Sequence, residues 1–282
     1  MKKIGVIGQG FVGSAIREGL SNYYDMVTYD INKSLRNCES LERLVRECKI
    51  IFQCLPTPMK KSGECDLSIV ELSLANVNRL CEHIDDTRIV VIKSTVPPGS
   101  TKRLDRMFDN IDVIFSPEFL TEANSFDDFK NQTRIIIGGR RPATSIVKTM
   151  FRKAFPRTPI IKTGSDTAEM TKYFINNFLT AKVLFANEMY EICQSHEIDY
   201  DKVCEYALYD DRIGKSHLSV PGPDGDLGVG GHCFPKDLAA MIYVAESIGV
   251  DPIVLKSISD KNHNVRTNLD WLKMKGRAVS DE

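Results

Sequence analysis

A cysteine on a glycine-rich turn is the side chain best placed for covalent chemistry. It lies in the segment GGHCFPKD, from Gly230 to Asp237. The apolar run after Asp237 predicts a helix, so Cys233 would lie just before the positive end of the helix dipole, with Lys236 nearby. Both features favour the thiolate, which is the nucleophilic form. The turn therefore predicts a reactive thiol at Cys233, and a buried structural cysteine is the ordinary alternative.

Three glycines near the other end of the chain follow an apolar strand and precede a helix. Gly8 permits a tight turn, Gly10 lets the backbone approach a pyrophosphate, and Gly13 allows close packing of helix on strand. Asp30 ends the next strand, 22 residues after Gly8, where a carboxylate can accept hydrogen bonds from an adenosine ribose. These residues predict NAD rather than NADP, because Asp30 would repel the extra phosphate of NADP. Lys33 nearby keeps NADP open, and a purely structural turn is the alternative.

A polar pair interrupts a long apolar helix predicted over residues 165–196. Lys172 and Asn176 are four residues apart, so they point from one face, one turn apart. Burying them is costly unless they reach water or a partner, so the pair indicates either a solvated face or a polar site. The apolar residues of this helix cover more than one face, which predicts that it forms the contact of a homodimer.

Composition excludes several classes of protein. The chain has 282 residues, of which 42% are apolar and 27% are charged, and a net charge of −1. No basic tract suggests a nucleic acid or an anionic membrane as partner. No apolar run approaches the roughly 20 residues that span a bilayer, and the chain begins with a strand, so we expect a cytoplasmic protein. The eight cysteines form no C-x-x-C pair and the five histidines are dispersed, so neither a disulfide framework nor a metal site is expected.

Strand-like runs alternate with helical stretches in the first half, which predicts an α/β domain with a doubly wound parallel sheet of the Rossmann type over residues 1–163. Residues 164–282 are predicted to form an all-helical dimerisation domain that carries the cysteine turn. Its expected helices cover residues 165–196, 199–209, 237–248 and 252–273. Unusual loops follow three of the strands, at 56–58, 94–101 and 116–122, and should converge on one cleft because ligands bind outside the carboxyl ends of such strands.

Taken in chain order, these segments resemble the UDP-glucose/GDP-mannose dehydrogenase family, the NAD-dependent four-electron oxidases of nucleotide sugars. The resemblance covers nearly the whole chain. It rests on GQGFVG with Asp30, LPTP, KSTVPPGST, SPEFLTEA, AEMTKYFINNF, DDRIG and GGHCFPKD. It implies NAD as cofactor, a nucleotide-sugar substrate similar to UDP-glucose, and a homodimer.

The resemblance also implies roles for individual residues. Cys233 is implied as the nucleophile that forms a thiohemiacetal and then a thioester. Proton transfer, oxyanion stabilisation and the placing of a water are implied for Lys172, Asn176, Asp237, Glu118 and Thr95. Cofactor contacts are implied for Gly8, Gly10, Phe11, Val12, Gly13, Asp30, Lys33, Pro56, Thr57, Ser94, Thr95, Glu122 and Lys236. Substrate contacts are implied for Glu118, Phe119, Leu120, Lys172, Asn176, Gly230 and Arg212, the last reaching the site of the neighbouring subunit.

One departure from the family leaves two alternatives open. Its members usually carry a third domain that grips the nucleotide, and this chain stops at Asp281-Glu282 after a helix that resembles the connector. We therefore expect a form without that domain. The first alternative is a cofactor-binding but catalytically incomplete subunit that needs the third domain in trans. The second is a two-electron dehydrogenase of the β-hydroxyacid type, which needs no cysteine; the presence of Cys233 and Asp237 argues against it.

Overall fold

The computed structural model describes residues 2–280, which divide into two compact units. The first contains residues 2–57 and 66–172, and the second contains residues 58–65 and 173–280. The long helix α7 (Ser165–Ser195) contributes its first two turns to the first unit and the rest to the second. The domain boundary expected after residue 163 stays a prediction. It did not anticipate that residues 58–65 would group with the helical unit.

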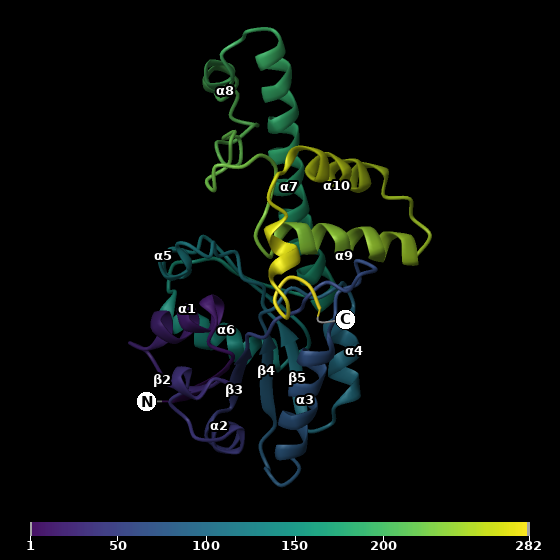
Figure 1. Ribbon diagram of the computed structural model, residues 1–282. Helices are drawn as coiled ribbons and strands as arrows, with labels where there is room; N and C mark the ends of the chain where they lie inside the picture. The colour runs from purple at the N-terminus through teal and green to yellow at the C-terminus, as the bar shows by residue number, and fades with distance from the viewer. Residues whose placement is uncertain (1, 281–282) are drawn as a thin grey trace. The chain divides into compact units, whose positions relative to one another are not determined.

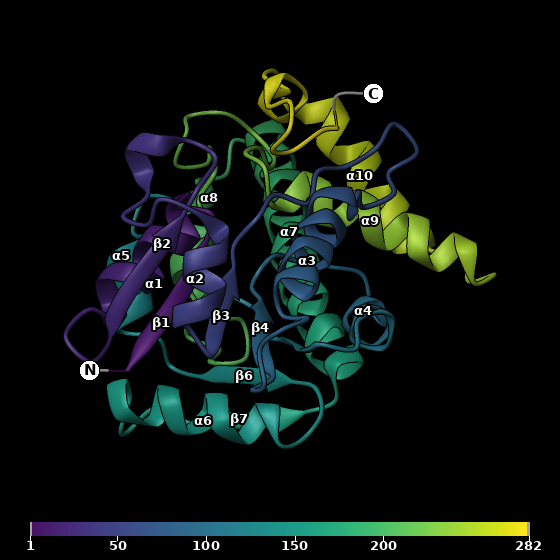
Figure 2. The same cartoon turned by 90° about the horizontal axis from the view of Figure 1, so that it is seen from below.

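The first unit is built on a seven-stranded sheet with the order β2-β1-β3-β4-β5-β6-β7. Its strands are β1 (Lys3–Ile7), β2 (Asp25–Tyr29), β3 (Ile50–Gln53), β4 (Arg88–Ile92), β5 (Ile111–Phe115), β6 (Ile135–Gly138) and β7 (Ile160–Thr163). Figure 1 shows β3, β4 and β5 side by side, and Figure 2 shows the same for β1, β3 and β4. All pairings are parallel except that of β5 with β6, which meet in antiparallel fashion at Phe115 and Gly138. The predicted fold class is confirmed, with this one pairing as a refinement.

Helices cover both faces of this sheet because its strands are apolar on both sides. One face packs against α1 (Phe11–Leu20), α5 (Ser125–Lys130) and α6 (Ala143–Ala154). The other packs against α2 (Leu41–Glu47), α3 (Ser68–Leu80) and α4 (Ser100–Met107). A short 3₁₀ helix, η1 (Lys33–Leu35), follows β2. This double winding brings the loops after the strands to one edge of the sheet, where ligands bind in such folds.

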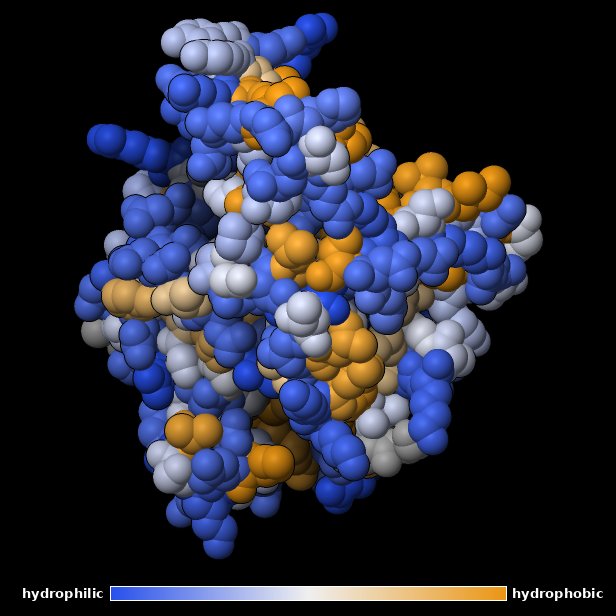
Figure 3. Space-filling model, turned by 45° about the horizontal axis from the view of Figure 1, so that its top comes forward, coloured by the Kyte–Doolittle hydropathy of each residue, from blue (hydrophilic) through white to orange (hydrophobic). Residues whose placement is uncertain are grey.

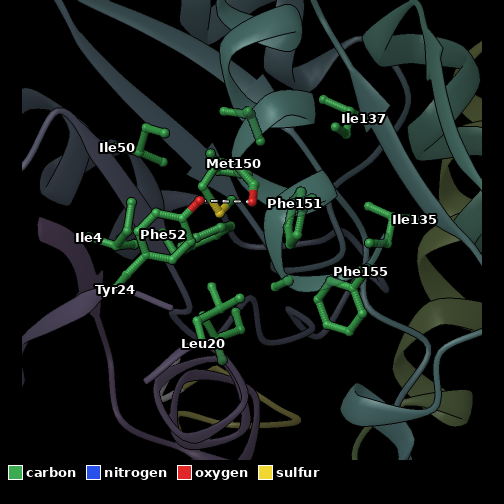
Figure 4. Packing of buried hydrophobic residues seen from close by; sticks show 14 of the residues in the cluster. Ile4, Leu20, Tyr24, Ile50, Phe52, Ile135, Ile137, Met150, Phe151 and Phe155 are labelled. Atoms are coloured by element: carbon green, nitrogen blue, oxygen red, sulfur yellow. Dashed lines mark hydrogen bonds between the residues drawn. The ribbon is translucent and has the colours of Figure 1, made fainter. Parts of the chain in front are cut away.

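Aromatic packing fixes the first of these two faces, as Figure 4 shows. The rings of Phe52 on β3 and Phe151 on α6 have centroids 5.7 Å apart. The buried Tyr24 hydroxyl donates a hydrogen bond to the Met150 carbonyl oxygen at 3.0 Å, which ties the turn between α1 and β2 to α6. A buried hydroxyl with a partner costs little, so this core is both apolar and satisfied.

The second unit consists of helices and loops. After α7 come α8 (Tyr200–Ala207), α9 (Phe234–Ser247), α10 (Ile253–Val265) and the 3₁₀ helix η2 (Asp270–Lys273). The expectation of one helix over residues 252–273 is wrong, because Arg266 adopts an extended backbone and ends α10. Its buried guanidinium instead bonds the carbonyl oxygens of Asn268 and Leu227 and the carboxylate of Asp224. Within residues 2–280, every helix falls short of the length and apolar character that crossing a bilayer demands.

Candidate active site

The glycine-rich turn between β1 and α1 has the geometry of a dinucleotide site. Gly8 has a φ of +87°, and a Cβ there would lie 2.2 Å from the Cys54 carbonyl oxygen. A Cβ on Gly13 would lie 1.9 Å from the Gly8 carbonyl oxygen, whereas a Cβ on Gly10 would meet nothing within 4 Å. Two glycines are therefore required by packing, and Gly10 leaves open space at the start of a helix, where a phosphate is favoured.

Asp30 is anchored to this turn. Its Oδ2 atom accepts a hydrogen bond from the Gln9 backbone N–H at 2.7 Å, and Oδ1 accepts one from the Asn32 backbone N–H at 2.8 Å. The carboxylate is thereby fixed at the end of β2, where ribose hydroxyls can donate to it. Together with the open space at Gly10, this arrangement fits a dinucleotide. Lys33, three residues after Asp30, begins η1 and is exposed.

The loops after β3 and β4 are joined by side-chain hydrogen bonds. The Thr57 hydroxyl donates to the Thr95 carbonyl oxygen at 2.9 Å, and the Ser94 hydroxyl donates to the Leu55 carbonyl oxygen. Three of the residues expected to contact the cofactor thus form one connected edge of the sheet. Among the others, Phe11 and Val12 open α1 half-buried, Pro56 is exposed, and Glu122 is exposed in the loop before α5.

An ion pair lies beyond β5 in the same unit. Glu118 Oε1 is 3.2 Å from the Lys172 ammonium nitrogen, and both side chains are at most one-tenth exposed. The second oxygen, Oε2, accepts a hydrogen bond from the Leu120 backbone N–H at 2.6 Å. The Phe119 ring contacts two cations, with Lys172 Nζ 5.3 Å and the Arg134 guanidinium carbon 4.1 Å from its centroid. Glu118 and Lys172 therefore form a pair that can exchange or share a proton.

A cavity of about 190 Å³ adjoins this pair. Its lining includes Glu118, Phe119, Leu120, Arg134 and Lys93. Sequence reasoning passed over Lys93 and Arg134. A signal for Lys93 was available, because this lysine directly continues the apolar strand RIVVI, and a lysine in a buried strand is costly without a partner.

The second unit holds Cys233 at the start of α9. Cys233 is the N-terminal cap residue of the helix, as expected from the sequence, and its side chain is half-buried. Asn176 lies on another helix, α7, and donates its side-chain N–H to Asp237 Oδ2 at 2.6 Å. Lys236 donates to the other oxygen, Oδ1, also at 2.6 Å. The carboxylate of Asp237 therefore holds an amide and an ammonium group one turn beyond the thiol.

Lys236 is a buried cation in this cluster. Only 6% of Lys236 and 1% of Asp237 is exposed. Burial by itself would lower the pKa of Lys236, but the Asp237 carboxylate, with the sulfurs of Cys65 and Cys233 nearby, raises it above its ordinary value. The ammonium group thus stays charged throughout the physiological range. A persistent cation favours the thiolate of a neighbouring cysteine.

The glycine-rich loop before Cys233 is held by polar side chains of other helices. Asn262 on α10 accepts a hydrogen bond from the Val229 backbone N–H at 2.7 Å. Asp270 on η2 accepts one from the Gly231 backbone N–H at 3.0 Å. A Cβ on Gly230 would lie 2.0 Å from the Arg266 guanidinium, so only glycine fits beside this buried arginine. Sequence reasoning did not find these three supports, which come from positions 30 or more residues further along the chain.

The residues expected to act on the substrate thus fall into two groups. Lys172 belongs to the first unit with Glu118, and Asn176 belongs to the second with Asp237 and Cys233, although the two side chains are one helical turn apart on α7. Arg212 follows α8, and its exposed guanidinium bonds the carboxylate of Asp210.

Two sequence profiles match the chain. Residues 25–155 match the NAD-binding domain of the UDP-glucose/GDP-mannose dehydrogenase family, and residues 166–264 match its central domain. The UDP-glucose 6-dehydrogenase AglM of Haloferax volcanii is 31% identical, over 92% of this chain and 69% of its own length. The UDP-glucose 6-dehydrogenase TuaD of Bacillus subtilis is 29% identical, over 99% of this chain and 68% of its own length. This chain thus spans about two thirds of the length of these relatives.

Solved structures agree with these matches. A UDP-glucose dehydrogenase from the hyperthermophilic archaeon Pyrobaculum islandicum is 28% identical and superposes with a TM-score of 0.84, over 94% of this chain and 68% of that one. A 3-hydroxyisobutyrate dehydrogenase from Mycobacterium tuberculosis has a TM-score of 0.74, over 92% of each chain, but at 13% identity this likeness shows the fold alone. The chain belongs to the UDP-glucose/GDP-mannose dehydrogenase family, whose NAD-binding and central domains it contains.

Proposed function

We propose that the protein oxidises the primary alcohol of a nucleotide sugar similar to UDP-glucose to the corresponding acid, in two successive two-electron steps, with Cys233 as a covalent nucleophile. The observation that carries the proposal is the thiol at the start of α9 beside the buried Lys236 ammonium group. A two-electron alcohol dehydrogenase has no need of such a thiol. The names of the relatives AglM and TuaD support UDP-glucose as the substrate class.

NAD⁺, held by the Gly8–Gly13 turn and Asp30, would accept a hydride from the substrate carbon. Glu118 takes the proton of the alcohol, directly or through a water placed by Thr95, as the alcohol becomes an aldehyde. The Cys233 thiolate then adds to the aldehyde carbon and forms a thiohemiacetal, so the aldehyde cannot escape. Transfer of a second hydride, from the thiohemiacetal carbon to a second NAD⁺ held at the same turn, would leave a thioester on Cys233. Attack by water would then release the acid, with the Cys233 thiolate as the leaving group.

Lys172 and Asn176 are assigned to the oxyanion that forms at each of these stages. A donor placed at a developing oxyanion contributes roughly 3 kcal/mol of transition-state stabilisation. Asp237 keeps the Asn176 amide and the Lys236 ammonium in place through its two carboxylate oxygens. The two ends of the Asp237 carboxylate thereby link the oxyanion donor to the cation that favours the thiolate.

We also propose a homodimer through α7. Large apolar side chains on this helix are exposed, although a surface helix of a monomeric protein would turn its apolar face to the core. They are Met170, Phe174, Phe178, Phe185 and Ile192. The rings of Phe174 and Phe178 stack with centroids 6.2 Å apart, so they form a continuous apolar surface. Figure 3 shows that hydrophobic side chains reach the surface in patches among polar ones. In the dimer, Arg212 would serve the site of the neighbouring subunit, and we expect the protein in the cytoplasm.

Counting NADH formed per nucleotide sugar consumed tests the proposed reaction. The purified protein is mixed with limiting UDP-glucose, or another member of a panel of UDP- and GDP-sugars, and excess NAD⁺. Two NADH per sugar nucleotide, with the acid as product, support the proposal. One NADH would indicate a two-electron dehydrogenase. None with any sugar, despite measurable NAD⁺ binding, would indicate a catalytically incomplete subunit.

A further inference from the structure

Lys93 is a buried cation for which the proposed reaction has no role. It follows β4 and is 5% exposed. Its ammonium group donates a hydrogen bond to the Pro117 carbonyl oxygen at 3.1 Å and lies 3.5 Å from the Ser116 hydroxyl. The Ser116 backbone N–H bonds the Ile92 carbonyl oxygen at 2.9 Å, so residues 92 and 116 are neighbours in the sheet. Lys93 therefore reaches across from one strand end to the turn that begins at the next.

The turn that Lys93 contacts carries Glu118. The Pro117 carbonyl oxygen, held by Lys93, lies one residue before Glu118, and the Leu120 backbone N–H holds Glu118 Oε2 from the other side. With the turn fixed on both sides, Glu118 Oε1 remains directed at the Lys172 ammonium group, 3.2 Å away. A carboxylate on an unanchored turn would sample several rotamers, and an offset of about 1 Å in a catalytic group costs up to about a hundredfold in rate.

We propose that Lys93 is a positioning residue for the Glu118–Lys172 ion pair. This inference rests on the proposed function, in which those two residues handle the proton and the oxyanion of the substrate. Lys93 acts through the Ser116–Leu120 turn and through its charge, and it is not assigned a contact with the reacting atoms.

The charge of Lys93 depends on pH near neutrality. Burial, together with the weaker effect of the nearby Lys172 ammonium, lowers the pKa of Lys93 to about 8, although Cys54 after β3 and Glu118 after β5 act in the opposite direction. Below about pH 8 Glu118 therefore lies near the charged Lys93 as well as near Lys172, and above about pH 8 Lys93 is neutral. Because the neutral amine still carries N–H groups, it can keep its bond to Pro117 after it loses the charge.

The same shift makes a prediction about stability. The pKa of Lys93 is about 8 in the folded chain and 10.5 in the reference state, so the unfolded chain binds more protons between these values. The cost of the buried charge is thus fully present below about pH 8 and is relieved as the pH rises toward 10.5. Stability relative to Lys93→Met should increase over this window.

Three variants of the full chain separate positioning from general stability. Lys93→Met removes the donor and the charge at similar length, and Lys93→Gln keeps a neutral donor. Lys162→Met is the matched control, because Lys162 is also a lysine with a lowered pKa that bonds a serine hydroxyl, Ser145, at 3.0 Å, and it lies on β7 outside the proposed site. Each is compared with wild type in NAD⁺ affinity, in kcat and KM for the sugar nucleotide, and in the pH dependence of kcat.

Lys93→Met should lower kcat by about tenfold to a hundredfold, the loss expected for a hydrogen bond that involves a charged group. NAD⁺ affinity and KM should change by less than about threefold, because Lys93 is not expected to contribute to binding of the ground state. Lys93→Gln should recover part of kcat. In wild type, kcat should change near pH 8, where Lys93 loses its charge, and both variants should lack this change. Lys162→Met should match wild type. A Lys93→Met protein with wild-type kcat and pH profile would overturn the proposal.

Titration of Lys93 can be measured without any enzymatic turnover, so it tests this inference separately from the proposed function. In protein labelled with ¹³C at lysine Cε, one resonance should titrate near pH 8, disappear in Lys93→Met, and move to lower pH in Glu118→Gln, because the stabilising anion is lost. An unchanged titration in Glu118→Gln would show that Lys93 and Glu118 are not coupled and would overturn the inference. If wild type oxidised no sugar nucleotide, the proposed function would fail, and this titration would still decide the coupling. If Lys93→Met did not fold, Lys93→Gln and the titration would decide it.

Discussion

Substituting the glycines of the β1–α1 turn separates cofactor binding from folding. Gly10 has a φ of −68°, which alanine adopts without strain, and a Cβ there meets nothing within 4 Å. Gly10→Ala should therefore leave stability unchanged or raise it by about 0.4–1 kcal/mol, through loss of freedom in the unfolded chain. The added methyl group would occupy the space through which a pyrophosphate approaches the backbone. We expect at least a tenfold loss of NAD⁺ affinity, about 1.4 kcal/mol.

Gly13→Ala is the matched substitution with the opposite expectation. Its Cβ would lie 1.9 Å from the Gly8 carbonyl oxygen, which is 3.0 − 1.9 = 1.1 Å closer than real Cβ contacts come. Because the neighbour is backbone, the helix and strand must separate, and such overpacking costs about 1–3 kcal/mol or more. Urea unfolding without cofactor and calorimetric titration with NAD⁺ measure the two effects. If Gly10→Ala bound NAD⁺ as tightly as wild type, the turn would not hold the pyrophosphate, and the reasoning would fail.

Three further predictions concern specificity, assembly and the buried ion pair. Asp30→Ala should narrow the preference for NAD⁺ over NADP⁺, measured as the ratio of dissociation constants; equal constants already in wild type would refute the role of Asp30. Phe178→Glu on α7 should convert the dimer to a monomer, as measured by light scattering at micromolar concentration. Ile253→Glu, at another exposed apolar position, should leave the dimer intact. A wild-type protein that is monomeric and fully active would contradict the proposed dimer. Asp237→Ala should lower the free energy of unfolding, measured with urea, by about 3–5 kcal/mol because it leaves the buried Lys236 ammonium group without its carboxylate partner. Adding Lys236→Met should recover part of this stability. If no stability were recovered, the broken ion pair would not be the cause of the loss.

Patterns within short stretches of the sequence predicted much of the fold and of the candidate site. The alternation of apolar strands and helices predicted the sheet, because both faces of a parallel sheet are covered and its strands are continuously apolar. The i, i+4 spacing of Lys172 and Asn176 predicted one helix face, and the residues after Cys233 predicted the helix that begins beside it. These patterns lie within a few residues of one another, so they can be read without the tertiary structure.

Contacts between distant segments could not be read in this way. The antiparallel pairing of β5 with β6 joins Phe115 to Gly138, and no local pattern specifies its direction. The early end of α10 depends on Arg266, whose side chain bonds a loop some 40 residues earlier in the chain. From the sequence, Lys93 could be interpreted only as the end of a strand. Its partners, the Pro117 carbonyl oxygen and Glu118, lie more than 20 residues further along the chain, and strand pairing brings them close to it.

The covalent role of Cys233 is the central claim, and mass spectrometry of the protein during turnover tests it most directly. Cys233→Ala should abolish acid formation while it retains a slow first hydride transfer. Cys233→Ser can still add to the aldehyde, but serine is a poorer leaving group, so an ester-linked adduct of the sugar nucleotide should accumulate and be detected as added protein mass. Lys172→Ala should instead slow both steps. If Cys233→Ala produced acid at near the wild-type rate, the thiol would be structural and the four-electron mechanism would be wrong.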